Sequence, residues 1–367
     1  MKIKNGINAI YLMQIIDALA FSISGIFIPI LMLDYGYDFR AIIYYFIIHN
    51  LVLLAGCFAA GYLAEGLGFK KILLFRYPFL FFYLIFLIYL KELDINIFVL
   101  AVASGLQSAF YYTPLNVLFA RHTNANEMGG SLGKLMALPQ IAGLAGPFLG
   151  GVIVYFFGFK PLFAATFIIS FCSMLPLLLS PSLKDNYHFR PKKGLAFFKK
   201  HPKLILSEIF DNIGGETDGI IWPIFVYFTV KNVVSIGALG TLVAIGSALF
   251  TLYIGKQVNK KNEKFFIRIA VPLLMVNWFV RYAFSNEILI YISTLLSGVF
   301  TVLLILPYTH LTFNKAKQDI NEDFFIIKEI PTVIGRLLIF VLALLFIDNI
   351  QSLFPLVGLS YLYFLFL

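Results

Sequence analysis

The sequence has 367 residues, of which 60% are hydrophobic, 17% aromatic and 13% charged, and its formal net charge is +9. Soluble domains contain about 25% charged and about 45–50% apolar residues, so this composition excludes an ordinary soluble protein. A nucleic-acid-binding protein is also excluded, because the basic residues lie in short loops between apolar runs rather than in one patch.

Apolar runs of about 20 residues, the length of a membrane-spanning helix, recur along nearly the whole chain. In lipid such runs must be helical, because no water is present to satisfy an open backbone. We therefore predict an all-α, polytopic membrane protein with twelve transmembrane helices. They are expected at 8–33, 41–63, 72–90, 95–119, 134–158, 161–180, 204–230, 233–255, 265–285, 288–312, 324–347 and 351–367.

Lys and Arg are concentrated in alternate loops, which indicates the orientation in the membrane. The loops on the side of the N-terminus hold most of them, beginning with Lys2 and Lys4, whereas the other loops hold Arg40, Lys91, Lys160 and Lys231. Loops rich in Lys and Arg stay in the cytoplasm. We therefore predict a multi-pass protein of the cell (inner) membrane with both termini cytoplasmic.

The longest polar stretch, residues 185–202, is also the most basic. Three regions are predicted from it: an N-terminal six-helix bundle at 1–180, a basic cytoplasmic linker at 181–202 and a C-terminal six-helix bundle at 203–367. Leu195, Phe197 and Phe198 among the lysines could form a short helix on the anionic inner leaflet. A solvated linker is the alternative that we favour.

The two halves resemble each other in the order of their glycines and prolines, which indicates a duplication. Shifting the chain by 194 residues, and by 193 in the fourth span, aligns one half with the other. The aligned pairs include Asp17 with Asp211, Gly25 with Gly219, Pro29 with Pro223, Gly61 with Gly255, Pro78 with Pro272, Gly105 with Gly298 and Pro114 with Pro307. Parallel halves of this kind are one architecture that transporters use.

A short polar break between the second and third spans contains Gly61, Glu65, Gly68 and the basic pair Lys70 and Lys71. Its spacing resembles the loop of the major facilitator superfamily, G-x-x-x-[D/E]-x-x-G-x-[K/R]. The resemblance implies two pseudo-symmetric six-helix bundles. It also implies that this loop is a cytoplasmic latch that holds the bundles together when the cavity faces outward. We expect Glu65 to act at the start of the eleventh span, whose amide end attracts an anion.

The fifth span contains a second motif that resembles the drug/proton antiporter-like exporters of this superfamily. Its small residues are Gly133, Gly146, Pro147, Gly150 and Gly151. Small residues at this spacing let helices approach closely, and the proline bends the span. The motif therefore predicts helix packing and favours export.

Four positions depart from the family pattern. Ala142 replaces a glycine of the fifth-span motif, and Ala101 stands where proton antiporters usually have an arginine in the fourth span. In the second half, Asn259 replaces the acid of the latch motif and Asn262 its second glycine. The latch is therefore expected to be asymmetric.

A carboxylate inside a membrane span costs about 2.5–3.5 kcal/mol, so each one is a candidate functional residue. Asp17 lies near the middle of the first span, with Gln14 on the same face. In the seventh span Glu208, Asp211 and Asp218 share a face. Because spans one, four, seven and ten line the central cavity in the superfamily, the resemblance implies that Asp17 and Asp211 face each other there.

Two roles are open for these acids: they exchange protons with the substrate, or they are structural partners of cations such as Arg336 or His49. Arg336, in the eleventh span, is expected either to pair with the acids of the seventh span or to bind an anionic group of the substrate. For Glu216, beside the irregularity expected at Gly214–Gly215, we favour a structural role.

Milder polar residues occur in the fourth span, where Gln107 and Tyr111 could line an aromatic, weakly polar cavity for amphipathic ligands. Hydrogen bonding between helices is the alternative. Arg76, Arg268 and Arg281 lie near predicted span ends, where we expect them to snorkel toward the membrane surface.

These features predict a secondary active transporter that works by alternating access. The net acidic site and the fifth-span motif favour proton-coupled export of a small amphipathic or cationic compound. Alternatives are uptake or facilitated transport of a nutrient or lipid-like solute, or a receptor or scaffold that does not transport. We expect a monomer in the lipid bilayer with a small-molecule substrate and protons as partners. No cofactor, metal, nucleic acid or enzymatic activity is expected, because no HExxH, GxSxG or CxxC motif is present.

Overall fold

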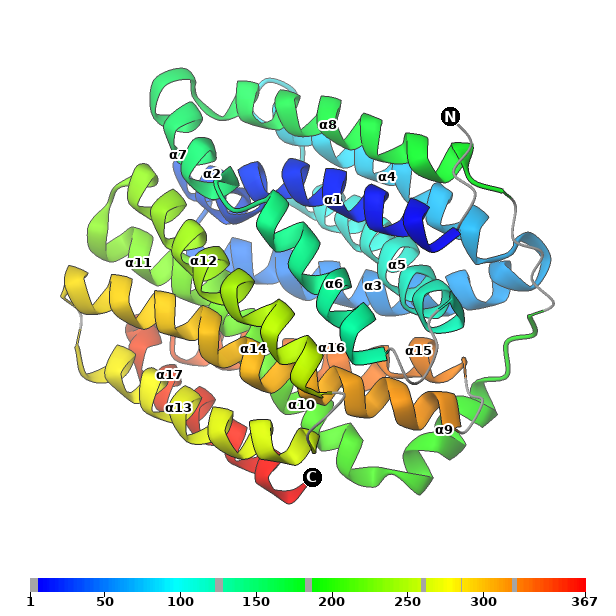
Figure 1. Ribbon diagram of the computed structural model, residues 1–367. Coiled ribbons are helices and arrows are strands. Elements are labelled where there is room, and N and C mark those ends of the chain that lie inside the picture. Colours follow the sequence, from blue (N-terminus) through cyan, green and yellow to red (C-terminus); the bar gives the residue numbers. More distant parts are fainter. Residues whose placement is uncertain (1–5, 123–127, 182–186, 259–261, 285, 319–321) are drawn as a thin grey trace.

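The structure, a computed structural model, describes residues 6–122, 128–181, 187–258, 262–284, 286–318 and 322–367. All regular secondary structure in these ranges is helical. The long helices run roughly side by side, with the N-terminal half uppermost and the C-terminal half lowermost in Figure 1. Three residues named in the sequence analysis lie outside the described ranges: Lys2, Lys4 and Asn259.

The N-terminal half consists of α1 (Gly6–Ser24), α2 (Ile28–Asp34), α3 (Phe39–Leu67), α4 (Phe69–Ile88), α5 (Ile97–His122), α6 (Met128–Ala142), α7 (Gly146–Phe157) and α8 (Phe159–Leu179). A further helix, α9 (Pro191–Lys200), precedes the C-terminal half. That half consists of α10 (Pro202–Glu216), α11 (Trp222–Val230), α12 (Val233–Val258), α13 (Glu263–Ala283), α14 (Glu287–Gln318), α15 (Phe324–Ile327), α16 (Glu329–Leu345) and α17 (Phe354–Ser360), followed by a 3-10 segment, Tyr361–Phe366.

Each predicted span coincides with one helix or with a set of short helices in line. The first span passes from α1 to α2 through a 3-10 turn at Gly25–Phe27, and the seventh passes from α10 to α11 through a π-helical turn at Thr217–Ile221. In the fifth span α6 ends at Ala142 and α7 begins at Gly146, with Pro147 in its first turn. Nine helical stretches of the described residues are long and apolar enough to cross a membrane by length and composition alone. The all-α fold prediction is therefore confirmed.

Tight connections between consecutive helices depend on glycine. Gly68 joins α3 to α4 with φ 78°, and Gly158 joins α7 to α8 with φ 80°. Both angles lie in the region that side chains disfavour and that glycine enters readily. This is a physical reason for the second glycine of the latch motif.

The two halves repeat the same helix contacts. α3 packs on α5 in the first half, and α12 packs on α14 in the second. At both contacts a glycine touches backbone: a Cβ added to Gly105 would lie 2.6 Å from the carbonyl oxygen of His49, and one added to Gly298 would lie 2.4 Å from that of Val243. These glycines are aligned by the sequence repeat, so the repeat includes the packing contact.

The most extensive contacts between the halves are α12 against α6 and α7, α14 against α6, and α16 against α3. α1, α4, α10 and α13 all begin at one end of the helix array, which we call the basic end; the N-terminus, α9 and α15 lie there, on the right of Figure 1. The expected boundaries at 180 and 203 remain predictions.

The linker differs from the expected solvated segment. α9 buries Gly194, Phe197 and Phe198, and the ring of Phe197 lies 4.6 Å from that of Phe324 in α15. The aromatic residues that suggested a membrane-surface helix therefore face the protein, because α15 offers them an apolar surface. The lysines remain on the outer side of α9, where Lys192 and Lys199 are exposed.

Candidate functional site

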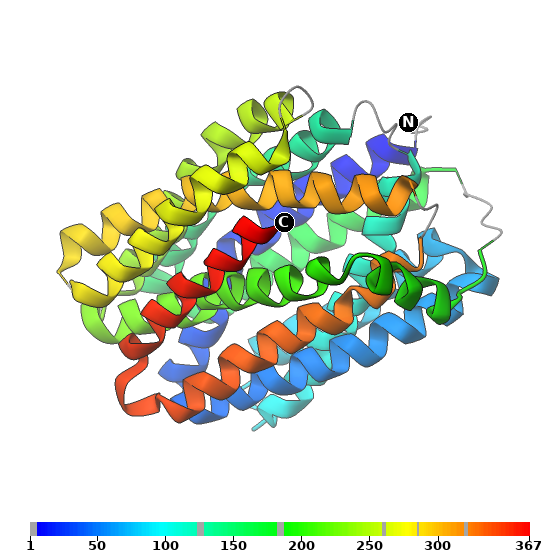
Figure 2. The ribbon, with the colours of Figure 1, turned by 90° about the horizontal axis from the view of Figure 1, so that it is seen from below.

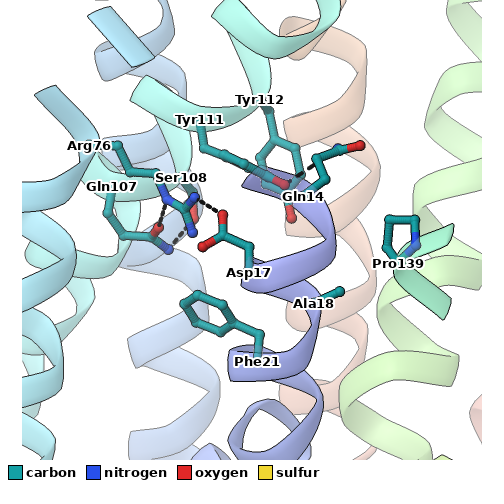
Figure 3. Close-up of a pocket in the computed structure, with 10 residues that line it drawn as sticks. All are labelled: Gln14, Asp17, Ala18, Phe21, Arg76, Gln107, Ser108, Tyr111, Tyr112 and Pro139. Atoms are coloured by element: carbon teal, nitrogen blue, oxygen red, sulfur yellow. Dashed lines mark hydrogen bonds and ion pairs between the residues drawn. The ribbon is translucent and has the colours of Figure 1, made fainter. Parts of the chain in front are cut away.

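A pocket of about 270 Å³ lies inside the N-terminal half, between α1, α4, α5 and α6. Four of the predicted site residues line it together: Gln14, Asp17, Gln107 and Tyr111. Figure 3 shows Asp17 pointing toward Arg76, with Tyr111 and Gln14 above it and Pro139 of α6 across the pocket. The pocket is thus built around one carboxylate.

Asp17 is an ion-paired residue. Its Oδ2 contacts the Nη1 of Arg76 from α4, and its Oδ1 accepts a 2.7 Å hydrogen bond from the Oγ of Ser173 in α8. The Asp17 and Arg76 side chains are 5% and 3% exposed. Burying two charges is stabilising only when they are paired and further hydrogen-bonded, and both conditions hold here.

Arg76 is deeply held, and the prediction that it snorkels was wrong. Its Nε donates to Gln107 Oε1 at 3.3 Å, and its guanidinium lies 4.1 Å from the centre of the Tyr111 ring. α4 begins at Phe69, earlier than the predicted span, so Arg76 is about two turns inside the helix. The family's usual arginine position in the fourth span is Ala101, and here a guanidinium reaches the face of α5 from the third span instead.

Gln14 and Tyr111 form the polar side of the pocket away from Arg76. Gln14 Nε2 donates to the Tyr111 hydroxyl at 3.5 Å, while its buried Oε1 has no partner among the described residues. An unsatisfied buried acceptor is costly, and a ligand donor can satisfy it. Aromatic rings of Phe21, Tyr111 and Tyr112 supply the apolar lining.

The other predicted acids do not join this pocket. Asp218 pairs with Arg281 of α13 at 2.6 Å and accepts a 2.6 Å hydrogen bond from Ser297 of α14. Arg281 has a fully buried side chain, with its guanidinium 4.1 and 4.5 Å from the rings of Trp222 and Trp278. Its predicted snorkelling was therefore also wrong, because a partly buried acid and two indole faces hold it.

Asp211 lies in a separate polar cluster with Glu208 in α10. Glu208 accepts hydrogen bonds from Tyr308 at 2.8 Å and Thr332 at 3.1 Å, and Lys328 Nζ lies 3.7 Å from it. Asp211 Oδ1 is buried and has no hydrogen-bond partner among the described residues. Asp211 is not among the described residues that line the Asp17 pocket, and its placement opposite Asp17 stays a prediction.

Arg336 occupies the interface between the halves. Its Nε lies 3.0 Å from Glu216 Oε1 and donates to Asn212 Oδ1 at 3.0 Å, and its Nη1 donates to Asn50 Oδ1 of α3 at 3.3 Å. Arg336 thus pairs with an acid of the seventh span, and that acid is Glu216. Asp218 lies in the π-helical turn that follows, so a strict α-helical wheel could not place it relative to Glu208 and Asp211.

The latch motif lies at the basic end, but its acid acts on a different partner from the one expected. Glu65 Oε1 accepts a 2.8 Å hydrogen bond from the backbone N–H of Phe189 rather than from the start of the eleventh span. Gly61 lies against Ile326 of α15 and Phe189, where a Cβ would come within 2.8 Å of the isoleucine. The expectation for Glu65 was wrong, because the segment before α9 covers this face of α3.

Charged contacts between the halves complete the latch region. Arg121, at the end of α5, makes two hydrogen bonds of 2.6 and 2.5 Å to the carboxylate of Glu322. Tyr187 donates to Asp323 at 2.6 Å, and burial, with that bond, raises the pKa of its hydroxyl. Of the predicted basic pair, Lys70 donates to the Ser180 and Pro181 carbonyls, whereas Lys71 is exposed.

The fifth-span motif packs on two helices at once. Cβ atoms added to Gly146 and Gly150 would clash with Ser22 and Ile23 of α1. A Cβ added to Gly133 would lie 3.2 Å from the Cα of Gly255 in α12, and Gly151 lies against Val233. The motif therefore joins α1 to the second half, and helix packing accounts for its small residues.

The pairs that the sequence argument missed are Asp17 with Arg76 and Asp218 with Arg281. A partial signal was present, because an acid inside a span needs a counter-charge and each half has an arginine in its third span. Ser173 and Ser297, the serine donors to the two acids, carried no sequence signal. The described residues contain no group of three or more His, Cys, Asp or Glu side chains that could hold a metal ion.

Comparison with known proteins agrees with this architecture. The chain is 25% identical over 272 residues to Multidrug resistance protein 2 of Bacillus subtilis (strain 168). That alignment covers 70% of this chain but only 64% of the relative's length.

Solved structures share the fold. FucP, a transporter of E. coli solved in an outward conformation, has a TM-score of 0.73 at 13% identity, covering 98% of this chain and 96% of FucP. The human organic anion transporter MFSD10 has a TM-score of 0.72 at 11% identity, covering 98% of each chain. A bacterial homologue of the iron transporter ferroportin, in an outward-facing state, has a TM-score of 0.69 at 13% identity, covering 97% of this chain and 98% of the homologue.

The family model described as Major Facilitator Superfamily matches residues 10–319. This match covers most of the chain and includes both the latch motif and the fifth-span motif. Together with the helical fold and the paired halves, it shows that this multi-pass membrane protein belongs to the Major Facilitator Superfamily, a non-enzymatic family of transporters.

Proposed function

We propose that the chain is a secondary transporter that exports a small amphipathic or cationic compound in exchange for protons. The observation that carries this proposal is a buried carboxylate, Asp17, in an aromatic pocket. Among the described residues its one charged partner is a side chain of the same half, Arg76. The similarity to Multidrug resistance protein 2 and the fifth-span motif support the direction of transport.

Asp17 can serve the exchange by holding one positive partner at a time. In the empty site that partner is Arg76, which also has Gln107 and the Tyr111 ring as neighbours. A cationic group of the substrate takes its place, and a proton on Asp17 removes the attraction for that cation. Proton and substrate therefore compete for one carboxylate, which is the requirement for antiport.

The rest of the pocket selects the substrate by shape and polarity. The buried Gln14 Oε1 accepts a hydrogen bond from the ligand, and the rings of Phe21 and Tyr112 contact its apolar part. Alternating access would rock one half against the other about this site. In this proposal the basic end faces the cytoplasm, in agreement with the bias of Lys and Arg toward cytoplasmic loops.

The test is proton flux driven by a substrate in proteoliposomes, with ethidium as the first lipophilic cation. We expect an imposed ethidium gradient to drive protons through the parent protein in the direction opposite to ethidium. Asp17→Asn should lose this coupling. The matched control is Asp94→Asn, the same change at an exposed loop residue whose φ of 45° asparagine tolerates. Coupled flux that is unchanged in Asp17→Asn would refute the assignment of Asp17.

A further inference from the structure

The C-terminal half has a basic pocket at its end that the proposed transport site does not use. It has a volume of about 140 Å³ and is lined by Lys203 at the start of α10, by Lys264 and Arg268 at the start of α13, and by the end of the 3-10 segment Tyr361–Phe366. Leu367 also lines it, and no acidic side chain occurs among the described residues of its lining. The side chains of the pocket thus carry net positive charge.

The cations converge because of where their helices begin. Lys264 and Arg268 are one turn apart on the same face of α13, and Lys203 is the second residue of α10. The N-terminal ends of two helices add partial positive charge at the same place. Glu263, the neighbouring acid, is bound to His310 Nδ1 at 2.9 Å and is not part of the pocket lining.

The lysine and arginine side chains are available to a ligand. Lys203, Lys264 and Arg268 are all exposed. Lys203 Nζ donates one hydrogen bond, to the carbonyl of Phe366 at 2.7 Å, which fixes it at the edge of the pocket. No ion pair is formed by Lys264 or Arg268 within the described chain.

An apolar groove of about 410 Å³ adjoins the basic pocket at Phe366, which lines both. The groove runs between α10, α16 and the C-terminal segment, and its walls include Phe210, Ile339, Leu356 and Tyr363. Figure 2 shows the C-terminal segment, in red, lying between α10 and α13, so the groove and the pocket lie on either side of one short helix. Leu356 and Phe366 are 45% and 65% exposed.

We propose that this composite surface binds one anionic phospholipid of the leaflet at the basic end. The phosphate lies among Lys203, Lys264 and Arg268, and one acyl chain lies in the groove. Charge decides the lipid class, because a zwitterionic headgroup would leave three cations without net compensation, and basic pockets between transmembrane helices recognise anionic headgroups. This proposal does not depend on what the chain transports.

The experiment is native mass spectrometry of the full chain in detergent, titrated with dioleoyl phosphatidylglycerol, dioleoyl phosphatidylcholine or inorganic phosphate. We expect phosphatidylglycerol to bind more tightly than the other two. The double variant Lys264→Gln/Arg268→Gln should weaken phosphatidylglycerol binding about 30-fold, because each basic side chain contributes about 1 kcal/mol to the binding free energy. Lys71→Gln/Lys199→Gln, an equal loss of charge at exposed positions of the basic end, is the matched control and should bind as the parent does.

A second variant tests the groove separately. Leu356→Trp fills it without changing charge, so phosphatidylglycerol binding should weaken several-fold while inorganic phosphate binding is unchanged. Equal binding of phosphatidylcholine, or phosphatidylglycerol binding that survives both the double variant and the groove variant, would overturn the proposal. Phosphate binding as tight as that of the lipid would show a simple anion site, which also contradicts it. If the double variant does not fold, Leu356→Trp decides.

Discussion

Each half of the chain places an aspartate–arginine pair with a buried arginine between its first and third spans, but at different depths. Arg76 lies seven residues after the start of α4, about 10 Å from the basic end, whereas Arg281 lies eighteen residues after the start of α13, about 27 Å from it. Both acids also accept a hydrogen bond from a serine. The same chemistry has been built twice, at positions that the sequence repeat does not align.

The surroundings of the two pairs differ in a way that suggests different roles. Arg76 lines the pocket and has Gln107 and Tyr111 beside it, so it has alternative partners if Asp17 is taken. Arg281 is enclosed by Trp222 and Trp278, and Trp222 is itself fixed by a 3.0 Å hydrogen bond to Thr294. An arginine with alternative partners suits exchange, and an arginine enclosed by two indole rings suits structural support.

The largest expected effect breaks the enclosed pair. Asp218→Asn should lower the free energy of unfolding by about 3–5 kcal/mol, because it leaves the fully buried Arg281 charge without a counter-charge. Asp17→Asn should cost less, because Arg76 retains Gln107 and faces the pocket. Chemical denaturation in detergent micelles measures both.

The control for this comparison is the double variant Asp218→Asn/Arg281→Met, which removes both charges. It should recover most of the stability lost in Asp218→Asn, since an apolar side chain between the tryptophans carries no charge to bury. Equal losses in Asp17→Asn and Asp218→Asn would show that the two pairs are not distinguished by their surroundings.

A smaller effect tests what the halves share. Gly105→Ala places a Cβ 2.6 Å from a carbonyl oxygen on the neighbouring helix, and Gly298→Ala places one 2.4 Å from such an oxygen. Overpacking of this kind costs about 1–3 kcal/mol, and the cost should be similar at the two positions. Thermal unfolding of both variants beside Gly66→Ala, where the added Cβ meets nothing within 4 Å, provides the measurement and its control. A large effect at one position alone would argue against equivalent packing.

The smallest effect concerns the basic end, where the halves differ again. Arg121 bonds Glu322 across the interface, whereas Glu263 and His310, near the second copy of the motif, bond within one half. Arg121→Gln should raise the ratio of molecules open at the basic end to molecules closed there by about fivefold or less. This limit follows because a partly exposed ion pair contributes at most about 1 kcal/mol. His310→Gln should not shift it. Distances between spin labels on α5 and α14 report the shift, and an identical distribution in parent and Arg121→Gln would contradict the latch.

Much of the fold could be predicted from the sequence, because the length of an apolar run and the position of a proline or glycine are local properties. The twelve spans and the break before Pro147 are of this kind. The two ion pairs are not, since nothing in the sequence near Asp17 or Arg76 tells which of the neighbouring helices faces it. The docking of α9 on α15 was missed for the same reason: an apolar face can meet lipid or protein, and the choice depends on a distant segment.

The two irregular turns have a consequence for how the halves meet at the end opposite the basic one. The sequence repeat aligns Gly25 with Gly219, yet the first lies in a tight 3-10 turn and the second in a wide π-helical turn. A 3-10 turn overwinds the chain relative to 3.6 residues per turn, and a π turn underwinds it. The segments beyond them, α2 and α11, are therefore rotated about their axes in opposite senses. α2 and α11 touch across the interface, so this contact joins two segments that the repeat aligns but that reach it through turns of opposite winding.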